Sequence, residues 1–127
     1  MKLRILGNSL RFRLGKSEVE SFGHSGSIEG GVRFGESSET DLRFKLQMID
    51  GPEFTGKFSN GNIVVGVPRS LVDQWVSNEE VSISGSQELD EQADLKFLIE
   101  KDFVCLNSHN DEDQSDRYPH PKGAEAC

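Results

Sequence analysis

Basic side chains alternate with apolar residues along several segments of the chain. They are Arg4, Arg11, Arg13, Arg33, Arg43 and Lys45. In an extended strand, alternate residues point to opposite faces, so the apolar residues would face a core and the basic residues would face solvent. If these strands are neighbours, their basic residues form one cationic face. The planar guanidinium fork of arginine suits carboxylates and phosphates, so the pattern predicts an anion-binding face.

The leading interpretation of this face is that its basic residues pair with acidic residues of adjacent strands and keep the surface solvated, and anion binding is the alternative. The charge of the chain bears on which partner is expected. Lysine and arginine number 14 against 22 aspartates and glutamates, a net charge of −8. Residues 1–49 hold eight basic and six acidic side chains, whereas residues 50–127 hold six basic and sixteen acidic ones. An acidic chain is a poor ligand for nucleic acid, so we expect an acidic protein or a small anion as the partner.

A different set of chemically capable residues lies near the C-terminus. It consists of the Cys105 thiol, the imidazoles of His109 and His120, and carboxylates that include Asp111 and Asp113. These are ligand types that bind Zn²⁺ or a similar divalent ion. The spacing lacks the second ligand pair of a structural zinc site and the central glycine of a calcium loop. A solvated acidic segment with incidental histidines is therefore the leading interpretation, with no cofactor, and a divalent metal site is the alternative.

The motifs of common enzyme classes are absent from the sequence. It has no Gly-x-x-x-x-Gly-Lys-Ser phosphate loop, no Gly-x-Ser-x-Gly elbow and no His-Glu-x-x-His zinc motif. Cys105 follows an apolar strand end, where a buried thiol is usually inert. The sequence thus favours a non-enzymatic binding or interaction module that uses the arginine-rich face or the acidic tail. A small metal-binding protein or metal-dependent enzyme built on residues 105–120 is the alternative.

Period-2 alternation predicts the strands that would position these side chains. The expected strands cover residues 3–5, 10–14, 28–34, 42–48, 54–58, 63–67, 81–83 and 95–106. Ser17 and Glu20 have the spacing of a capping box, so a short helix is expected from Ser17 to about Phe22. Pro68 is expected to open a second short helix that carries Trp75.

Most connections are too short for a β-α-β crossover, so the strands should be mainly antiparallel. We expect a mainly β fold with two short helices, arranged as a curved antiparallel sheet or a partly open small β-barrel. No internal repeat is visible. The residues predicted to share one core are Leu3, Ile5, Leu10, Phe12, Leu14, Leu42, Phe44, Leu46, Val65, Trp75, Phe97 and Ile99.

The length of 127 residues fits one domain. We expect a β-rich domain over residues 1–106 and a polar, acidic tail over residues 107–127, because residues 107–116 contain no apolar side chain to bury. No signal-peptide pattern, long apolar run or disulfide framework is present. These features predict a soluble, cytoplasmic protein without a membrane partner.

Motifs at both ends of the chain are similar to those of a known family. They are KLRILGNSLRFRL at residues 2–14, EKDFVCL at residues 100–106 and EDQSDRYP at residues 112–119. With them, the chain resembles a family of short bacterial proteins that form a domain of unknown function. The resemblance implies a single-domain bacterial protein and carries over no activity, cofactor or site residues.

Overall fold

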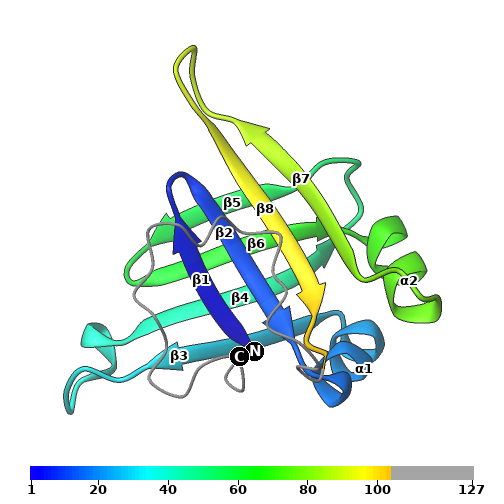
Figure 1. Cartoon of the computed structure of the whole chain (residues 1–127). Coiled ribbons are helices and arrows are strands. Elements are labelled where there is room, and N and C mark those ends of the chain that lie inside the picture. The colour runs from blue at the N-terminus through cyan, green and yellow to red at the C-terminus, as the bar shows by residue number, and fades with distance from the viewer. Residues whose placement is uncertain (104–127) are drawn as a thin grey trace, which may run out of the picture.

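The computed structural model describes residues 1–103 and contains two four-stranded sheets and two helices (Figure 1). Sheet A has the order β1 (Lys2–Leu6), β2 (Ser9–Leu14), β8 (Asp94–Lys101) and β7 (Ser82–Glu88). Sheet B has the order β3 (Ser27–Val32), β4 (Leu42–Ile49), β6 (Asn62–Pro68) and β5 (Thr55–Ser59). The helices are α1 (Lys16–Ser25) and α2 (Arg69–Ser77), and a 3₁₀ turn (Ser38–Thr40) precedes β4. The predicted mainly β fold with two short helices is confirmed.

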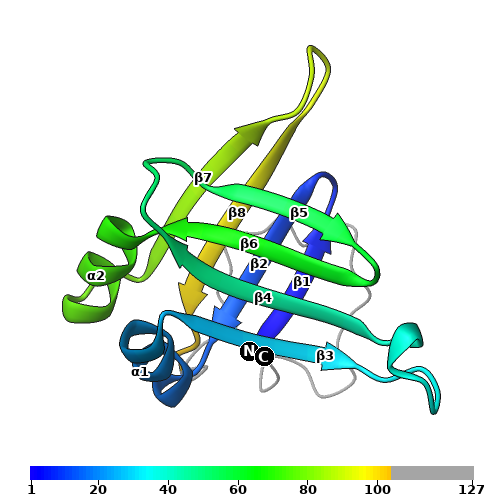
Figure 2. The same cartoon turned by 180° about the vertical axis from the view of Figure 1, so that it is seen from behind.

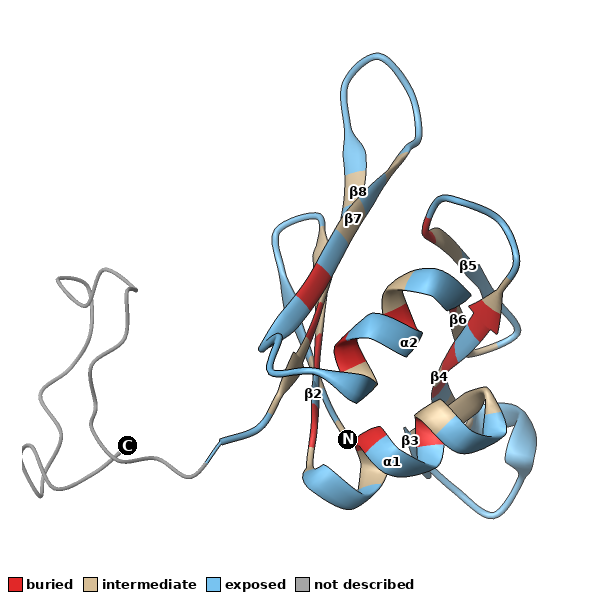
Figure 3. Cartoon of the chain, turned by 90° about the vertical axis from the view of Figure 1, so that its right-hand side faces the viewer, coloured by how far each residue is buried: buried red, intermediate tan, exposed pale blue. Residues whose placement is uncertain are grey.

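The two sheets lie face to face, with their strands crossing at a steep angle (Figures 1 and 2). Both helices lie on one side of this sandwich, and their buried residues face the space between the sheets (Figure 3). The core between the layers consists of Phe12, Leu14, Val19, Phe22, Phe44, Leu46, Met48, Phe54, Val65, Val67, Val72, Trp75, Ile83, Phe97 and Ile99. Each layer is therefore half-buried, with one face on this core and one outer face.

Each sheet is mixed, and neither closes into a barrel. The inner strands β2 and β8 pair in parallel, as do β4 and β6, while the outer strands pair antiparallel with them. Each helix carries the chain from one sheet to the other, so no single sheet contains a β-α-β unit. The parallel pairs instead join strands from the first and second halves of the chain. The prediction of a single curved sheet or partly open barrel is thus refined to two open sheets.

The two halves of the described chain have the same order of elements. Residues 2–49 form a hairpin, a helix and a hairpin, and residues 55–101 repeat that order. Buried residues correspond at a constant separation of 53 positions: Phe12 and Val65, Leu14 and Val67, Val19 and Val72, Phe22 and Trp75, Phe44 and Phe97, Leu46 and Ile99. The strand register repeats too, since Phe12 lies opposite Ile99 and Val65 lies opposite Leu46. The structure thus contains an internal repeat that was not visible in the sequence.

Most of the predicted core is buried, and the register predicted for the fourth strand is confirmed. Phe44 and Leu46 are buried, whereas Arg43 is exposed. Leu3, Leu10 and Leu42 are half-buried. Ile5 is an error in the prediction because it is 63% exposed. It lies on the edge strand β1 near the turn to β2, and its counterpart in the repeat, Phe58, is 70% exposed at the same place on β5.

Two features predicted for the second half of the chain are confirmed, namely the Asn60-Gly61 turn and the burial of Trp75 on a short helix. Asn60 and Gly61 both have positive φ, as the Asn-Gly hairpin signal requires. Trp75 is fully buried, and its indole N–H donates to the carbonyl of Val81 at 3.1 Å. The Lys101 ammonium lies 5.7 Å from the centre of the Trp75 ring. The tryptophan thereby connects α2 to the residue that precedes β7 and to the last residue of β8.

Helix α1 begins one residue earlier than predicted, and Glu18 rather than Glu20 caps it. Gly15 is the N-cap residue, and its amide donates to Glu18 Oε1 at 2.9 Å. The other carboxylate oxygen, Oε2, accepts from the Met1 amino group. The pKa of Glu18 therefore lies below its ordinary value of 4.5. The hydrogen bond from the Met1 amino group is the larger cause, and the hydrogen bond from the Gly15 amide is the second.

We expect the substitution Glu18→Gln to lower the free energy of unfolding by about 1 kcal/mol at neutral pH, a typical loss for a helix cap. The folded state lowers the Glu18 pKa. The contribution of Glu18 to the free energy of unfolding is therefore fully present above the unfolded pKa and is lost as pH falls through the folded pKa. The difference between the two proteins should therefore narrow as pH drops below 4.5. Urea unfolding across this pH range is the measurement. Glu20→Gln, an exposed change on the same helix, is the control, and an equal loss in both variants would contradict the capping role.

Candidate anion-binding site

The basic residues predicted to form one face are divided between two faces. Arg4, Arg11 and Arg13 lie on the outer face of sheet A, and Arg43 and Lys45 lie on the outer face of sheet B. Since both sheets turn their inner faces to one core, these outer faces point to opposite sides of the molecule (Figures 1 and 2). The prediction of a single continuous face is wrong, and the predicted role in anion binding applies to each group separately.

The sheet A group, together with Lys2, brings four basic residues side by side, which we call the cationic patch: Lys2, Arg4, Arg11 and Arg13. In the antiparallel register of β1 and β2, Lys2 lies directly opposite Arg13, and Arg4 lies directly opposite Arg11. Together with Glu100 they line a hollow of about 120 Å³. The sequence prediction missed Lys2, although its position two residues before Arg4 carries the same alternation.

Carboxylates lie at one end of the cationic patch. Glu100 Oε1 accepts from Arg13 Nη2 at 2.9 Å and from Arg13 Nε at 3.1 Å. Asp102 Oδ2 lies 3.4 Å from the Lys2 ammonium. Arg4 and Arg11, at the other end, each make at least one interaction as well. Like charges directly opposite each other destabilise a strand pair, so this arrangement favours the presence of acidic groups over the whole patch.

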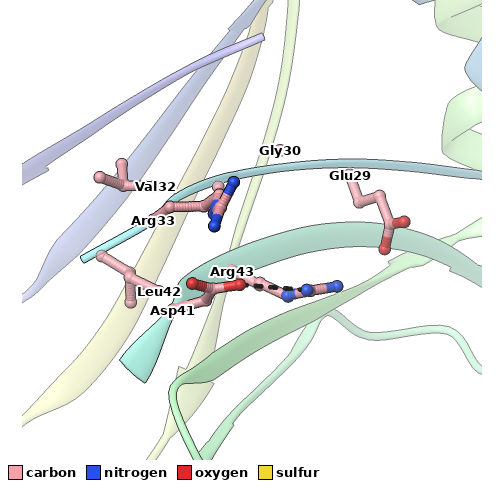
Figure 4. A pocket seen from close by; sticks show the side chains of 8 residues that line it. Glu29, Gly30, Val32, Arg33, Asp41, Leu42 and Arg43 are labelled. Carbon is pink, nitrogen blue, oxygen red and sulfur yellow. Dashed lines mark hydrogen bonds and ion pairs between the residues drawn. The ribbon is translucent and has the colours of Figure 1, made fainter. Parts of the chain in front are cut away.

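Arg33 and Arg43 line a different hollow, of about 280 Å³, between the end of β3 and the start of β4 (Figure 4). Asp41 and Glu29 also line it. Asp41 Oδ2 accepts from Arg43 Nη2 at 3.2 Å, while its buried Oδ1 has no hydrogen-bond partner among residues 1–103. Two carboxylates balance the two guanidinium groups here. The hollow is thus less suited to an anion than the cationic patch.

Lys45, the remaining predicted residue, lies two residues after Arg43 on β4 but lines a different hollow. It lines a third hollow together with Arg69 and His24, at the side of the molecule where the helices lie. Arg69 and His24 were not predicted as site residues. No alternating pattern surrounds either of them, because each lies on a helix rather than a strand.

The predicted metal ligands Cys105, His109, Asp111, Asp113 and His120 lie outside the described residues, as does the predicted acidic tail. Within residues 1–103, no group of three or more histidine, cysteine, aspartate or glutamate residues is placed to hold a metal ion. In the same part of the chain, none of the helices has the length and apolar character needed to cross a bilayer.

The fold and these surfaces define a two-sheet domain made of two similar halves, with a cationic patch on one sheet. The chain belongs to the family of unknown function DUF7009, whose family model matches residues 1–122. The resemblance to a domain of unknown function is thereby confirmed. Comparisons with curated proteins and with solved structures gave no match.

Glu100 gives the first test of the patch, because it is the acidic residue that lines the hollow. We expect Glu100→Gln to raise the affinity for an acidic peptide by about two- to fivefold and to cost at most about 1 kcal/mol of stability. Fluorescence anisotropy with a labelled peptide measures the first effect and urea unfolding the second. Glu88→Gln, an exposed change on β7 of the same sheet, is the control. Equal gains in both variants would show only a net-charge effect.

Proposed function

We propose that this protein is a non-enzymatic binding module that holds an acidic polypeptide segment against the cationic patch. The observation that carries the proposal is the presence of two like-charged pairs of cross-strand neighbours, Lys2 with Arg13 and Arg4 with Arg11. Like charges directly opposite each other destabilise a strand pair. Glu100 and Asp102 already offset this at Arg13 and Lys2, and Arg4 and Arg11 each make at least one interaction as well. A carboxylate placed between two of these side chains turns that repulsion into attraction.

The spacing of the cationic patch favours an extended peptide as the ligand. Lys2 and Arg4 are two residues apart on one strand, as are Arg11 and Arg13 on its neighbour. Two residues along a strand span about 6.6 Å. Acidic residues at alternate positions of an extended segment repeat at the same distance, so two or more carboxylates can contact the patch together. Arginine adds bidentate geometry to such contacts.

The chain carries a segment of this chemistry in its own sequence. Asp111, Glu112, Asp113 and Asp116 lie within residues 110–116, which read NDEDQSD. We propose that this segment competes with the acidic partner for the patch. A competitor on the same chain acts at an effective concentration of about a millimolar when its linker is short and flexible. The partner would then bind only if it presents more, or better placed, carboxylates.

The direct test uses a synthetic peptide of sequence NDEDQSD and the full chain. The double variant Arg4→Gln, Arg11→Gln should lose at least about fivefold in affinity at about 0.05 M salt, and binding by the wild type should fall at about 0.5 M salt. The control is Lys16→Gln, Lys57→Gln, which removes the same charge from exposed positions outside the patch. Equal losses in the two variants, or binding that is insensitive to salt, would refute the proposed function.

The competition has its own test. Replacing Asp111, Glu112, Asp113 and Asp116 by their amides should raise the affinity for the same peptide, since the internal competitor is gone. The control neutralises four exposed acidic residues elsewhere, namely Glu53, Glu79, Glu80 and Glu91. Anisotropy titrations compare the two variants. If both bind the peptide equally well, the segment is not a competitor, and the patch remains to be judged by the arginine variants.

A further inference from the structure

A hollow of about 310 Å³ lies where the end of α1 and the start of α2 meet the outer face of sheet B. Three basic residues line it: His24 from α1, Lys45 from β4 and Arg69 from α2. The other lining residues are Gly23, Ser25, Gly26, Ser27, Gln47 and Met48. No acidic residue is among these lining residues, although the chain as a whole is strongly acidic.

The two permanent cations of this hollow are only weakly compensated. Lys45 is half-buried and lies opposite Glu29 in the strand register, yet its side-chain ammonium makes no ion pair or hydrogen bond within residues 1–103. Arg69 Nε donates to Asp50 Oδ1 at 3.2 Å, and Asp50 is 92% exposed. Arg69 Nη1 lies 3.6 Å from the sulfur of Met48. An exposed ion pair of this kind contributes only about 0–1 kcal/mol, so most of the positive charge remains available to a ligand.

The internal repeat shows that the fold does not require the charge of Lys45. At the separation of 53 positions, the counterpart of Lys45 is Leu98, on the outer face of sheet A. The counterpart of Gln47 is Glu100, and the counterpart of Arg69 is Lys16. Of these three positions, the other half thus has an apolar residue at one and an acidic residue at another, within the same backbone arrangement. The basic, acid-free lining belongs to one half only.

We propose that this hollow binds the phosphate group of a small molecule. A phosphate dianion needs donors from several directions, and Lys45, Arg69, Gln47 and His24 supply them from three different elements. Small residues at positions 25–27 leave room for its oxygens. The volume also leaves space for a small organic part beside the phosphate. This site lies on the sheet opposite the cationic patch, so the proposal is independent of the proposed function.

The experiment titrates the full chain with inorganic phosphate and, separately, with glycerol 3-phosphate. Amide chemical shifts of Gly26, Ser27 and Gln47 give the binding curve. Lys45→Met keeps the aliphatic stem and removes the charge, and Arg69→Gln removes the guanidinium; each should weaken binding by at least about tenfold. Arg69→Lys keeps the charge and should restore part of the affinity. Lys16→Gln changes the matching position of the other half and should bind as the wild type does.

Each outcome decides the proposal. Stronger binding of glycerol 3-phosphate identifies a phosphomonoester as the ligand, and equal or stronger binding of inorganic phosphate identifies the free ion. Absence of saturable shifts at these amides with both probes overturns the proposal. Equal weakening by Lys16→Gln and Arg69→Gln also overturns it, because the effect would then reflect net charge. Thermal unfolding of every variant separates lost binding from lost folding.

Discussion

The parallel pairing of β2 with β8, repeated as β4 with β6, joins the two halves of the chain in both sheets. Each half alone consists of two hairpins separated by a helix, and a two-stranded hairpin is marginally stable at best in water. The inner pairs turn four hairpins into two four-stranded layers that enclose one core. Phe12 and Ile99 of one layer and Leu46 and Val65 of the other are buried because of these pairs. The helices, the edge strands and both outer faces depend on that arrangement.

The two halves of the repeat are more similar at buried positions than at solvent-exposed positions. Most buried positions keep apolar residues in both halves, with Met48 and Ile83, which correspond to Lys101 and Gly30, as exceptions. On the outer faces, Arg11 and Arg13 correspond to Val64 and Gly66, whereas Arg4 corresponds to another basic residue, Lys57. Packing requires the apolar residues at the buried positions, because replacing a buried side chain by a smaller or larger one leaves a cavity or strain. Solvent-exposed positions carry no such requirement. Each of the two proposed anion sites includes outer positions at which the halves differ, such as Arg11 and Lys45, and at such positions an added binding property costs the fold least.

The sequence predicted what depends on local periodicity. Strand alternation correctly placed Phe44 and Leu46 in the core and Arg43 outside it. This prediction is reliable because a shift of one residue would move every side chain of the strand to the other face. Alternation did not predict which strands are neighbours, because contacts between segments distant in the sequence decide the strand order. As a result, Arg4 and Arg43 were expected on one face, whereas they lie on the outer faces of different sheets. The repeat was hidden because it preserves burial more than identity, although LRF at residues 42–44 and LKF at residues 95–97 are a readable trace of it.

The overall acidity of the chain sets the range over which either site can act. A net charge of −8 repels anions at a distance, and at physiological ionic strength charges are screened beyond about 8 Å. The patch and the hollow therefore cannot attract ligands over long distances, and their selectivity must come from contact geometry. For the cationic patch, alternating carboxylates meet this condition; for the hollow, a single group with several oxygens does. If both proposals hold, the cationic patch and the hollow at the helix ends select different anions, although both rely on lysine and arginine.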